Sequence, residues 1–346
     1  MPINYEPING ATDVATTRTI LHEVIPLTGT LVSGTYGTFP NDDNIKNYSH
    51  GQFQSVYDYP YLSSSANHIF DLTIGYDETS GFSGSANTQN SKKINMYNQF
   101  SQVLLGYTGS TNRVRLFESD LTLNEDNPMK EVFFVNLSRL LTKDEIKKGS
   151  VSITLGTASY GAPFGGTVTY SDSNATETGG TLNTVGGDYG VLLNAANNLT
   201  GGIVFYQAGV MVLTASAFSG TLGLPSDFYN GLSLADVMTG SAISASADAF
   251  RHRMQNLQFN NSTEINSTVY FCRAPHNKFN YSSNPTYLSG GSIRVKNNVR
   301  SNPPIAYTTT IGLYNSQNEL LAVAKLSEPL RKDPTNELTL RVRLDY

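Results

Sequence analysis

A chain of 346 residues with a net charge of −5 has no basic surplus with which to hold a phosphate backbone, so nucleic-acid binding is not expected. Hydrophobic residues make up 39% of the chain and charged residues only 15%, which excludes a disordered protein and leaves the surface to Asn, Ser, Thr, Gly and Tyr. This composition favours strands and turns, because Tyr and Thr fit pleated surfaces while Gly and Asn supply turn geometries. We therefore predict a mainly β, sandwich-like fold with helical insertions.

Residues 1–149 are predicted to form a β-rich region with one amphipathic helix. The helix is expected at residues 92–107, where Ile94, Tyr97 and Phe100 begin a series of apolar residues at spacings of three and four. Segments rich in Thr, Val, Ile, Leu and Phe predict strands around it. The predicted strands are residues 19–25, 29–34, 69–76, 114–117 and 131–137, and a single helical turn is predicted at residues 141–146.

Residues 150–218 have the clearest β pattern. The most apolar stretch, residues 203–218, is shorter than the roughly 20 residues of a membrane-spanning helix and contains Gln207. It is expected to form a buried strand pair or one long bent strand, and no contact with a membrane is expected. The other strands predicted in this region are residues 151–155, 166–170 and 189–193.

A helical insertion is predicted at residues 219–258, where apolar residues recur at helical spacing in an Ala- and Ser-rich stretch. Residues 259–346 are predicted to be a C-terminal β module that completes the core. Its last segment, residues 338–346, alternates between apolar and polar residues, so we expect a half-buried strand there. Two strands, residues 258–261 and 268–274, are predicted with a turn between them. Two more are predicted at residues 306–312 and 319–326, before the closing strand, which begins near residue 337.

Sequence motifs for catalysis or metal binding are not found. No two of the 5 histidines have the spacing that places metal ligands on one helical face, and no serine elbow or phosphate-binding loop occurs. Cys272 is the only cysteine, which excludes an intramolecular disulfide and indicates a buried, inert thiol. The first residues, MPINYE, lack the pattern of a secretory signal, so synthesis in the cytoplasm is expected. We predict no enzyme activity, no catalytic residue, no metal and no cofactor.

One acidic group has both a functional and a structural interpretation. Paired carboxylates hydrolyse glycosidic bonds, and carboxylate oxygens bind calcium. A solvated loop of acids has neither role, and the neighbouring Asn and Pro residues favour this structural interpretation. The residues concerned are Glu118, Asp120, Glu125 and Asp126.

The basic triplet Arg251-His252-Arg253 lies near the end of the predicted insertion helix. Such a group can contact an anionic partner. More often, arginines in this position interact with the C-terminus of their helix or with an acid on a neighbouring element. The second interpretation is favoured here.

The last part of the chain carries two motifs. The first is FNYSSNPTY at residues 279–287, and the second consists of TTIGLYN at residues 309–315, NELLAVAKLS at residues 318–327 and RVRLD at residues 341–345. Both resemble virion structural proteins of marine T4-like tailed phages, and the second has a looser similarity to a strand pair of phage tail-collar domains. The resemblance covers about a fifth of the chain. It implies a component of the phage particle and assigns no catalytic residue.

The first motif also has a physical interpretation. Its Asn and Ser side chains can satisfy backbone groups of a loop, and the proline forces an extended conformation on the residue before it. A fixed loop flanked by aromatic side chains is suited to contact with a neighbouring subunit, because aromatics bury a large area at low entropic cost. A corner between two strands of the same chain is the equally weighted alternative. The candidate contact residues are Phe279, Tyr281, Asn284, Pro285 and Tyr287.

The resemblance implies a structural component of a tailed bacteriophage virion, assembled by protein–protein contacts in the tail, baseplate or neck. Its expected partners are copies of itself, as a homo-oligomer in a symmetric ring or array, and other virion proteins. The alternatives are a host-receptor or carbohydrate-binding protein associated with tail fibres, a capsid decoration protein, and an enzyme that degrades surface polysaccharide.

Overall fold

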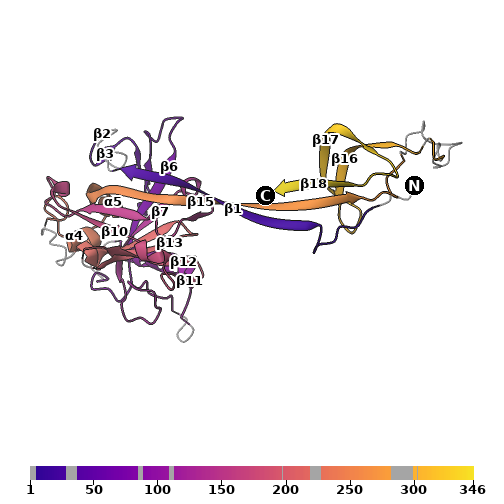
Figure 1. Cartoon of the computed structure of the whole chain (residues 1–346). Helices are drawn as coiled ribbons and strands as arrows, with labels where there is room; N and C mark the ends of the chain where they lie inside the picture. The colour runs from indigo at the N-terminus through magenta and orange to yellow at the C-terminus, as the bar shows by residue number, and fades with distance from the viewer. Residues whose placement is uncertain are drawn as a thin grey trace. The chain divides into compact units, whose positions relative to one another are not determined.

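The computed structural model is mainly β, with 45% of residues in strands and 15% in helices, which confirms the predicted fold class. Contacts within the chain define a larger unit, Leu21–Thr263, and a smaller unit formed by Met1–Ile20 and Glu264–Tyr346 (Figure 1). Strands β1 (Val14–Thr28) and β15 (Met254–Ala274) contain residues of both units. The structure describes residues 5–28, 37–84, 89–108, 113–196, 198–218, 227–281, 299–301 and 303–346.

The larger unit is built on one antiparallel sheet with the strand order β15-β9-β10-β12-β13-β14-β7-β6-β5-β4. Besides β15, the strands of this sheet are β4 (Ile45–Asn47), β5 (Gln54–Tyr57), β6 (His68–Tyr76), β7 (Glu131–Leu137), β8 (Glu145–Ile146), β9 (Ser152–Gly156), β10 (Thr167–Ser171), β11 (Leu182–Thr184), β12 (Gly187–Asn194), β13 (Thr200–Phe205) and β14 (Val210–Thr214). Strands β2 (Gly37–Thr38) and β3 (Asn41–Asp42) form a separate two-stranded sheet. Its helices are α2 (Asn90–Leu104), α3 (Arg139–Thr142), α4 (Leu234–Thr239) and α5 (Ile243–Arg253), with short 3-10 helices at Pro163–Gly165, Ser173–Thr176 and Ala215–Phe218.

The central strands β7, β13 and β14 are buried on both faces. In β7, Phe133 and Val135 belong to one buried cluster and Val132 and Phe134 to the other, because successive side chains of a strand point to opposite faces. The same double burial explains the long apolar stretch at residues 203–218. Of the two predicted forms, it adopts the strand pair, in which β13 and β14 are antiparallel neighbours.

Helices cover the two faces of this sheet. Tyr97 and Leu104 of α2 belong to one buried cluster, and Phe250 of α5 belongs to the other. Helix α2 approaches β6 closely at Gly75, where a Cβ atom would lie 2.9 Å from the backbone nitrogen of Tyr97 and 3.0 Å from the carbonyl oxygen of Lys93. The amphipathic helix predicted at residues 92–107 is thus confirmed as α2, which ends at Leu104, because Tyr107 already forms a bridge to Val114; the helix backbone packs directly on a strand.

The two arginines at the end of α5 are fully buried, which agrees with the structural interpretation of the basic triplet. Arg251 donates from Nη1 to Asp42 Oδ2 at 2.5 Å and from Nη2 to Asp248 Oδ1 at 3.1 Å. Arg253 instead donates to backbone carbonyls, including Phe228 O at 2.8 Å from Nη2 and Ala158 O at 2.8 Å from Nη1. These bonds tie the end of α5 to segments far away in the sequence.

Lys93 of α2 is also fully buried. Its Nζ donates to the carbonyl oxygens of Met238 and Gly240, each at 2.7 Å, and so satisfies the end of helix α4. Burial lowers the pKa of Lys93 to about 8, because a charged amine loses its hydration there.

Two short predictions in the first half are wrong. Residues 114–117 form no strand: only Val114 makes an isolated bridge, to Tyr107, because the segment folds as irregular chain against α2. The helical turn predicted at residues 141–146 ends at Thr142. Lys143 has a positive φ of 54°, and Glu145–Ile146 pair with β15 as strand β8.

The turn predicted between residues 258–261 and 268–274 is absent, because β15 is one continuous strand of 21 residues. Its middle is held extended by pairing with β8 at Asn261–Ser262 and with β18 from Ser267 onwards. The predicted helical insertion at residues 219–258 contains α4 and α5, but its last residues, from Met254, already belong to β15.

The smaller unit contains β16 (Ala306–Tyr314), β17 (Leu320–Lys332) and β18 (Leu338–Asp345). Strand β18 pairs with β15, and its alternating burial with Val342 at the centre confirms the half-buried strand predicted there. Both large buried clusters lie between Leu27 and Phe259 in the described chain. Residues 264–346 group with Met1–Ile20 in the smaller unit. The prediction had instead placed residues 259–346 in a module that completes the same core as the rest of the chain.

We expect the substitution Arg251→Met to lower the free energy of unfolding by about 3–5 kcal/mol, because it leaves the buried carboxylate of Asp42 without its cation. Urea denaturation of the full chain measures this. The exposed Arg341 provides the control, since Arg341→Met should change the stability by no more than about 0.5 kcal/mol. A loss below about 1 kcal/mol at Arg251 would contradict the structural role of the pair.

Lys93 predicts a specific dependence of stability on pH. Between its folded pKa of about 8 and its unfolded value of 10.5, the folded chain binds fewer protons than the unfolded chain, so the free energy of unfolding rises with pH. Relative to Lys93→Met, the wild type should gain about 2 kcal/mol between pH 7.5 and pH 9.5. Urea titrations of both proteins at the two pH values measure this difference, and parallel curves would show that Lys93 keeps its ordinary pKa.

Candidate functional site

The described part of the predicted contact loop is its stem in the smaller unit. Phe279 is half-buried and has a positive φ of 58°, and Tyr281 is 42% exposed. The other three predicted contact residues, Asn284, Pro285 and Tyr287, lie outside the described residues.

The buried Lys332 anchors this stem to the end of β17. Its Nζ donates to Asn280 Oδ1 at 2.7 Å and to Asp333 O at 3.0 Å. Asn280 Nδ2 donates in turn to His276 O at 2.7 Å. Burial lowers the pKa of Lys332, although Asp333 and Glu337 favour its charge. The loop stem and strand β17 therefore form one hydrogen-bonded structure.

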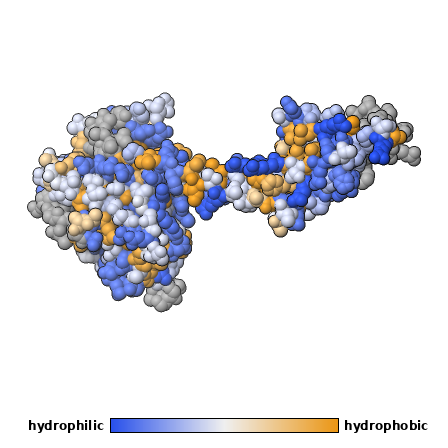
Figure 2. Space-filling view, viewed as in Figure 1, coloured by the Kyte–Doolittle hydropathy of each residue, from blue (hydrophilic) through white to orange (hydrophobic). Residues whose placement is uncertain are grey.

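Strands β16 and β17 form a separate two-stranded antiparallel sheet in the smaller unit. Leu313 points inward and is buried, whereas Tyr314, Leu320, Leu321 and Val323 are each at least 44% exposed. Hydrophobic residues are also visible on the surface of this unit in Figure 2. The exposed apolar side chains make the β16–β17 hairpin a candidate contact surface.

The larger unit has an open cleft of about 520 Å³. Among the described residues that line it, Asp126 is the only charged one, and most of the others carry hydroxyl or amide groups. Such a lining suits a neutral, hydroxyl-rich ligand better than an anion. The lining residues are Ser119, Asp126, Asn127, Pro128 and Met129 from the irregular segment before β7, and Asn198, Leu199, Thr200, Thr214 and Ser216 from β13, β14 and their flanks.

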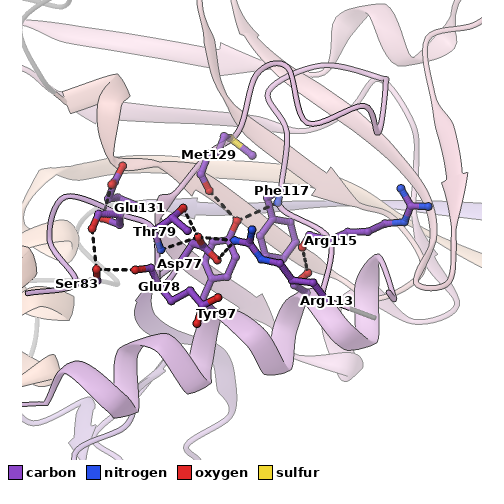
Figure 3. A network of polar contacts seen from close by, with 12 residues as sticks. Asp77, Glu78, Thr79, Ser83, Tyr97, Arg113, Arg115, Phe117, Met129 and Glu131 are labelled. Carbon is purple, nitrogen blue, oxygen red and sulfur yellow. Dashed lines mark hydrogen bonds and ion pairs between the residues drawn. The ribbon is translucent and has the colours of Figure 1, made fainter. Parts of the chain in front are cut away.

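Tyr97 holds the two ends of the loop that forms one wall of the cleft (Figure 3). Its hydroxyl donates to Met129 O at 2.9 Å and accepts from Phe117 N at 3.0 Å. Met129 N also donates to Phe117 O at 2.7 Å. Because Tyr97 is buried in helix α2, the helix fixes the base of this loop.

A second group of polar side chains in Figure 3 holds the irregular segment before β7 close to its start, at Arg113. Asp77, which follows β6, accepts from Arg113 Nη2 at 2.8 Å and from the backbone and side chain of Thr79 at 2.9 and 2.6 Å. Burial favours a higher pKa for Asp77, but the bonds from Thr79 and Arg113 outweigh it and leave the pKa below its ordinary value. The ion pair is thus maintained at neutral pH.

The predicted acidic group lies in this loop, and the carboxylates of Glu118, Asp120 and Asp126 accept hydrogen bonds from the loop itself. Glu118 is buried and accepts from Asn124 N at 3.3 Å; burial raises its pKa, although backbone bonds from Glu125 and Asn124 oppose this. Asp120 accepts from Thr122 N and Asn127 Nδ2, each at 2.8 Å. Burial favours a higher pKa for Asp120, but these bonds outweigh it and lower the pKa. Bonds within the loop agree with the structural interpretation.

The other candidate groups among the described residues do not assemble into a site. Within the described ranges, no group of three or more His, Cys, Asp or Glu residues is placed to hold a metal ion. Cys272 is half-buried, and burial raises the pKa of its thiol, which is the opposite of activation. None of the described helices is long and apolar enough to cross a membrane.

No protein-family model matches the chain, and neither a curated protein nor a solved structure is significantly similar to it. The two candidate surfaces, the β16–β17 hairpin and the polar cleft, therefore have to be interpreted from their own chemistry.

We expect Tyr97→Phe to lower the free energy of unfolding by about 1–3 kcal/mol, because the buried Phe117 N–H and Met129 C=O each lose a partner. Amide hydrogen exchange at Phe117 should accelerate, which urea denaturation and exchange NMR would detect. Tyr107 is 51% exposed, so Tyr107→Phe should alter neither quantity measurably. Unchanged exchange at Phe117 in Tyr97→Phe would show that the loop has another support.

Proposed function

We propose that this protein is a structural component of a tailed bacteriophage virion, and that it assembles by protein–protein contacts in the tail, baseplate or neck. The observation that carries the proposal is the exposed apolar surface of the β16–β17 hairpin, in the part of the chain whose motifs resemble phage virion proteins. In a monomer this surface faces water; in an assembly a neighbouring subunit covers it.

The physical argument rests on the stability of small sheets. A two-stranded hairpin is marginal in water unless other elements pack on it. Several exposed apolar side chains on such a hairpin are typical of a surface that a partner covers. In a ring or array, contacts that bury more than about 1,000 Å² between copies are sufficient for a stable and specific interface. The predicted partners are accordingly copies of this chain and other virion proteins.

A second candidate function is the binding of a host-surface glycan, which the polar cleft of the larger unit favours. Sugar hydroxyls both donate and accept hydrogen bonds, as do the Ser, Thr and Asn side chains that line the cleft. The volume of about 520 Å³ lies within the range of small-molecule sites. Retention of the chain on a glycan array would favour this function.

Mass spectrometry of purified phage particles tests the virion proposal directly. The chain should be present in a fixed number of copies per particle, and immunogold labelling of intact particles should place it at the tail, baseplate or neck. Labelling on the capsid surface would assign it to decoration instead. Absence from purified particles would overturn the proposal.

A further inference from the structure

Residues 5–8 form a short arm before the turn that leads into β1, and side chains alone hold this arm in place. Within the described chain, the backbone of residues 5–8 makes no hydrogen bond to another segment. Tyr5 contacts Tyr314 of β16, with the ring centroids 4.9 Å apart. Glu6 forms an ion pair with Lys278, at 2.6 Å between Oε2 and Nζ, and the two side chains are 28% and 36% exposed. Such partly exposed contacts are weak, so the arm can detach at low cost.

The arm lies on an apolar patch of the β16–β17 hairpin. This hairpin patch consists of Gly312, Tyr314, Leu320 and Val323. A Cβ atom at Gly312 would lie 2.8 Å from Tyr314 Cε2 and 3.1 Å from Leu320 Cδ1. Tyr314 pairs with Leu320, and Gly312 pairs with Val323. Residues directly opposite each other in two strands share a face, so the four lie together. Tyr314, Leu320 and Val323 remain 44%, 52% and 52% exposed with the arm in place, so much of the patch is uncovered.

The kind of partner follows from what already fits this surface. The arm supplies an aromatic ring for Tyr314 and a carboxylate for Lys278. A second copy of the chain carries the same arm and can make both contacts with no change in the patch. Exchange of an identical terminal element is a low-cost route to association. The turn after the arm has hydrogen bonds of its own, from Thr12 N and Asp13 N to Asn9 O, and keeps them wherever the arm lies.

The arm is short, which brings exchanging copies into direct contact. Four residue steps separate Tyr5 from Asn9, and an extended chain advances at most about 3.6 Å per step, so the arm reaches about 14 Å. The turn of one copy must therefore lie close to the hairpin patch of the other. At that separation the two smaller units can cover the parts of the patches that the arms leave open. Exchange thus buries apolar area that stays exposed in the closed form, in which the arm lies on its own hairpin.

We propose that two copies of this chain exchange their arms, so that Tyr5 and Glu6 of each copy contact Tyr314 and Lys278 of the other. The contact is isologous, because each copy gives one arm and receives one. It deepens the proposed function, on which its role in a particle rests, by naming the arm and the hairpin patch as the two halves of a contact between copies.

Charge exchange between positions 6 and 278 tests whether the ion pair joins two chains. Glu6→Lys and Lys278→Glu each place like charges at the two positions. Each variant alone loses the pair in the closed and in the exchanged form, so its self-association should equal that of the wild type. In an equal mixture of the two full-length variants, only arm exchange between unlike chains restores both pairs. Sedimentation velocity should show that the mixture associates at least tenfold more tightly than either variant alone.

The ion pair between Arg343 and Asp345 provides the matched control, because both residues lie on β18 and arm exchange cannot separate them. A mixture of Arg343→Glu and Asp345→Lys should associate no more tightly than its separate components. The gain in the mixture of Glu6→Lys and Lys278→Glu should decrease at high salt, because both side chains of that pair are partly exposed.

Cross-linking provides a second measurement on the ring contact. Chains with Tyr5→Cys and chains with Tyr314→Cys, each also carrying Cys272→Ala, are co-expressed with different tags and treated with a short bismaleimide. Arm exchange should link the unlike chains. Replacing Tyr314→Cys by Tyr307→Cys gives the background from random collision, because Tyr307 lies on the same strand and is 64% exposed. The link to position 314 should exceed this background at least tenfold.

Arm exchange is overturned if the charge-exchange mixture associates no more tightly than its components. Should circular dichroism show that a charge variant is unfolded, cross-linking decides instead, and a yield at the Tyr307→Cys background overturns the proposal. These outcomes are independent of the virion test. A chain found in particles without arm exchange removes only the contact, and arm-exchanged copies absent from particles remove only the virion function.

Discussion

The fully buried ion pair between Arg251 and Asp42 is the interaction on which the rest of the larger unit depends. A guanidinium group that has lost its hydration is tolerated only when carboxylates and carbonyls surround it, so α5 requires the N-terminal segment that contributes Asp42. Helix α5 ends at Arg253, and β15 begins at the next residue, Met254. The two buried arginines therefore also hold the point in the core where this long strand begins.

Local sequence patterns predicted the elements whose environment is uniform along their length. The apolar run at residues 203–218 forms two adjacent strands because both faces of the sheet are covered there, and α2 follows its three- and four-residue spacing. The middle of β15 was beyond such reasoning. Its Ser, Thr, Asn and Glu residues have the composition of a turn, and only the pairing with β8 and β18, which are distant in sequence, keeps them extended.

The candidate sites were less accessible to prediction, because each depends on residues that are distant in the sequence. Arg251 stood out as a charged residue near a helix end, yet its partner Asp42 is 209 positions away. The cleft forms where the loop at residues 119–129 lies beside residues 198–216, and no local sequence motif indicates that these two segments are close in space. Strand β17 was predicted as residues 319–326, but alternation alone cannot indicate that Leu320 and Leu321 are both exposed.

The division of the chain between the two units has a consequence for biosynthesis. The larger unit ends at Thr263, so all of its residues have been made before the ribosome reaches β16, β17 or β18. The strands with the most exposed apolar edge in the smaller unit thus appear only when most of the polypeptide can already be folded. Because the exposed apolar hairpin is synthesised after the whole of the larger unit, it is present on a nascent chain for only a short time. Aggregation between nascent chains on the same messenger through this surface is thereby reduced.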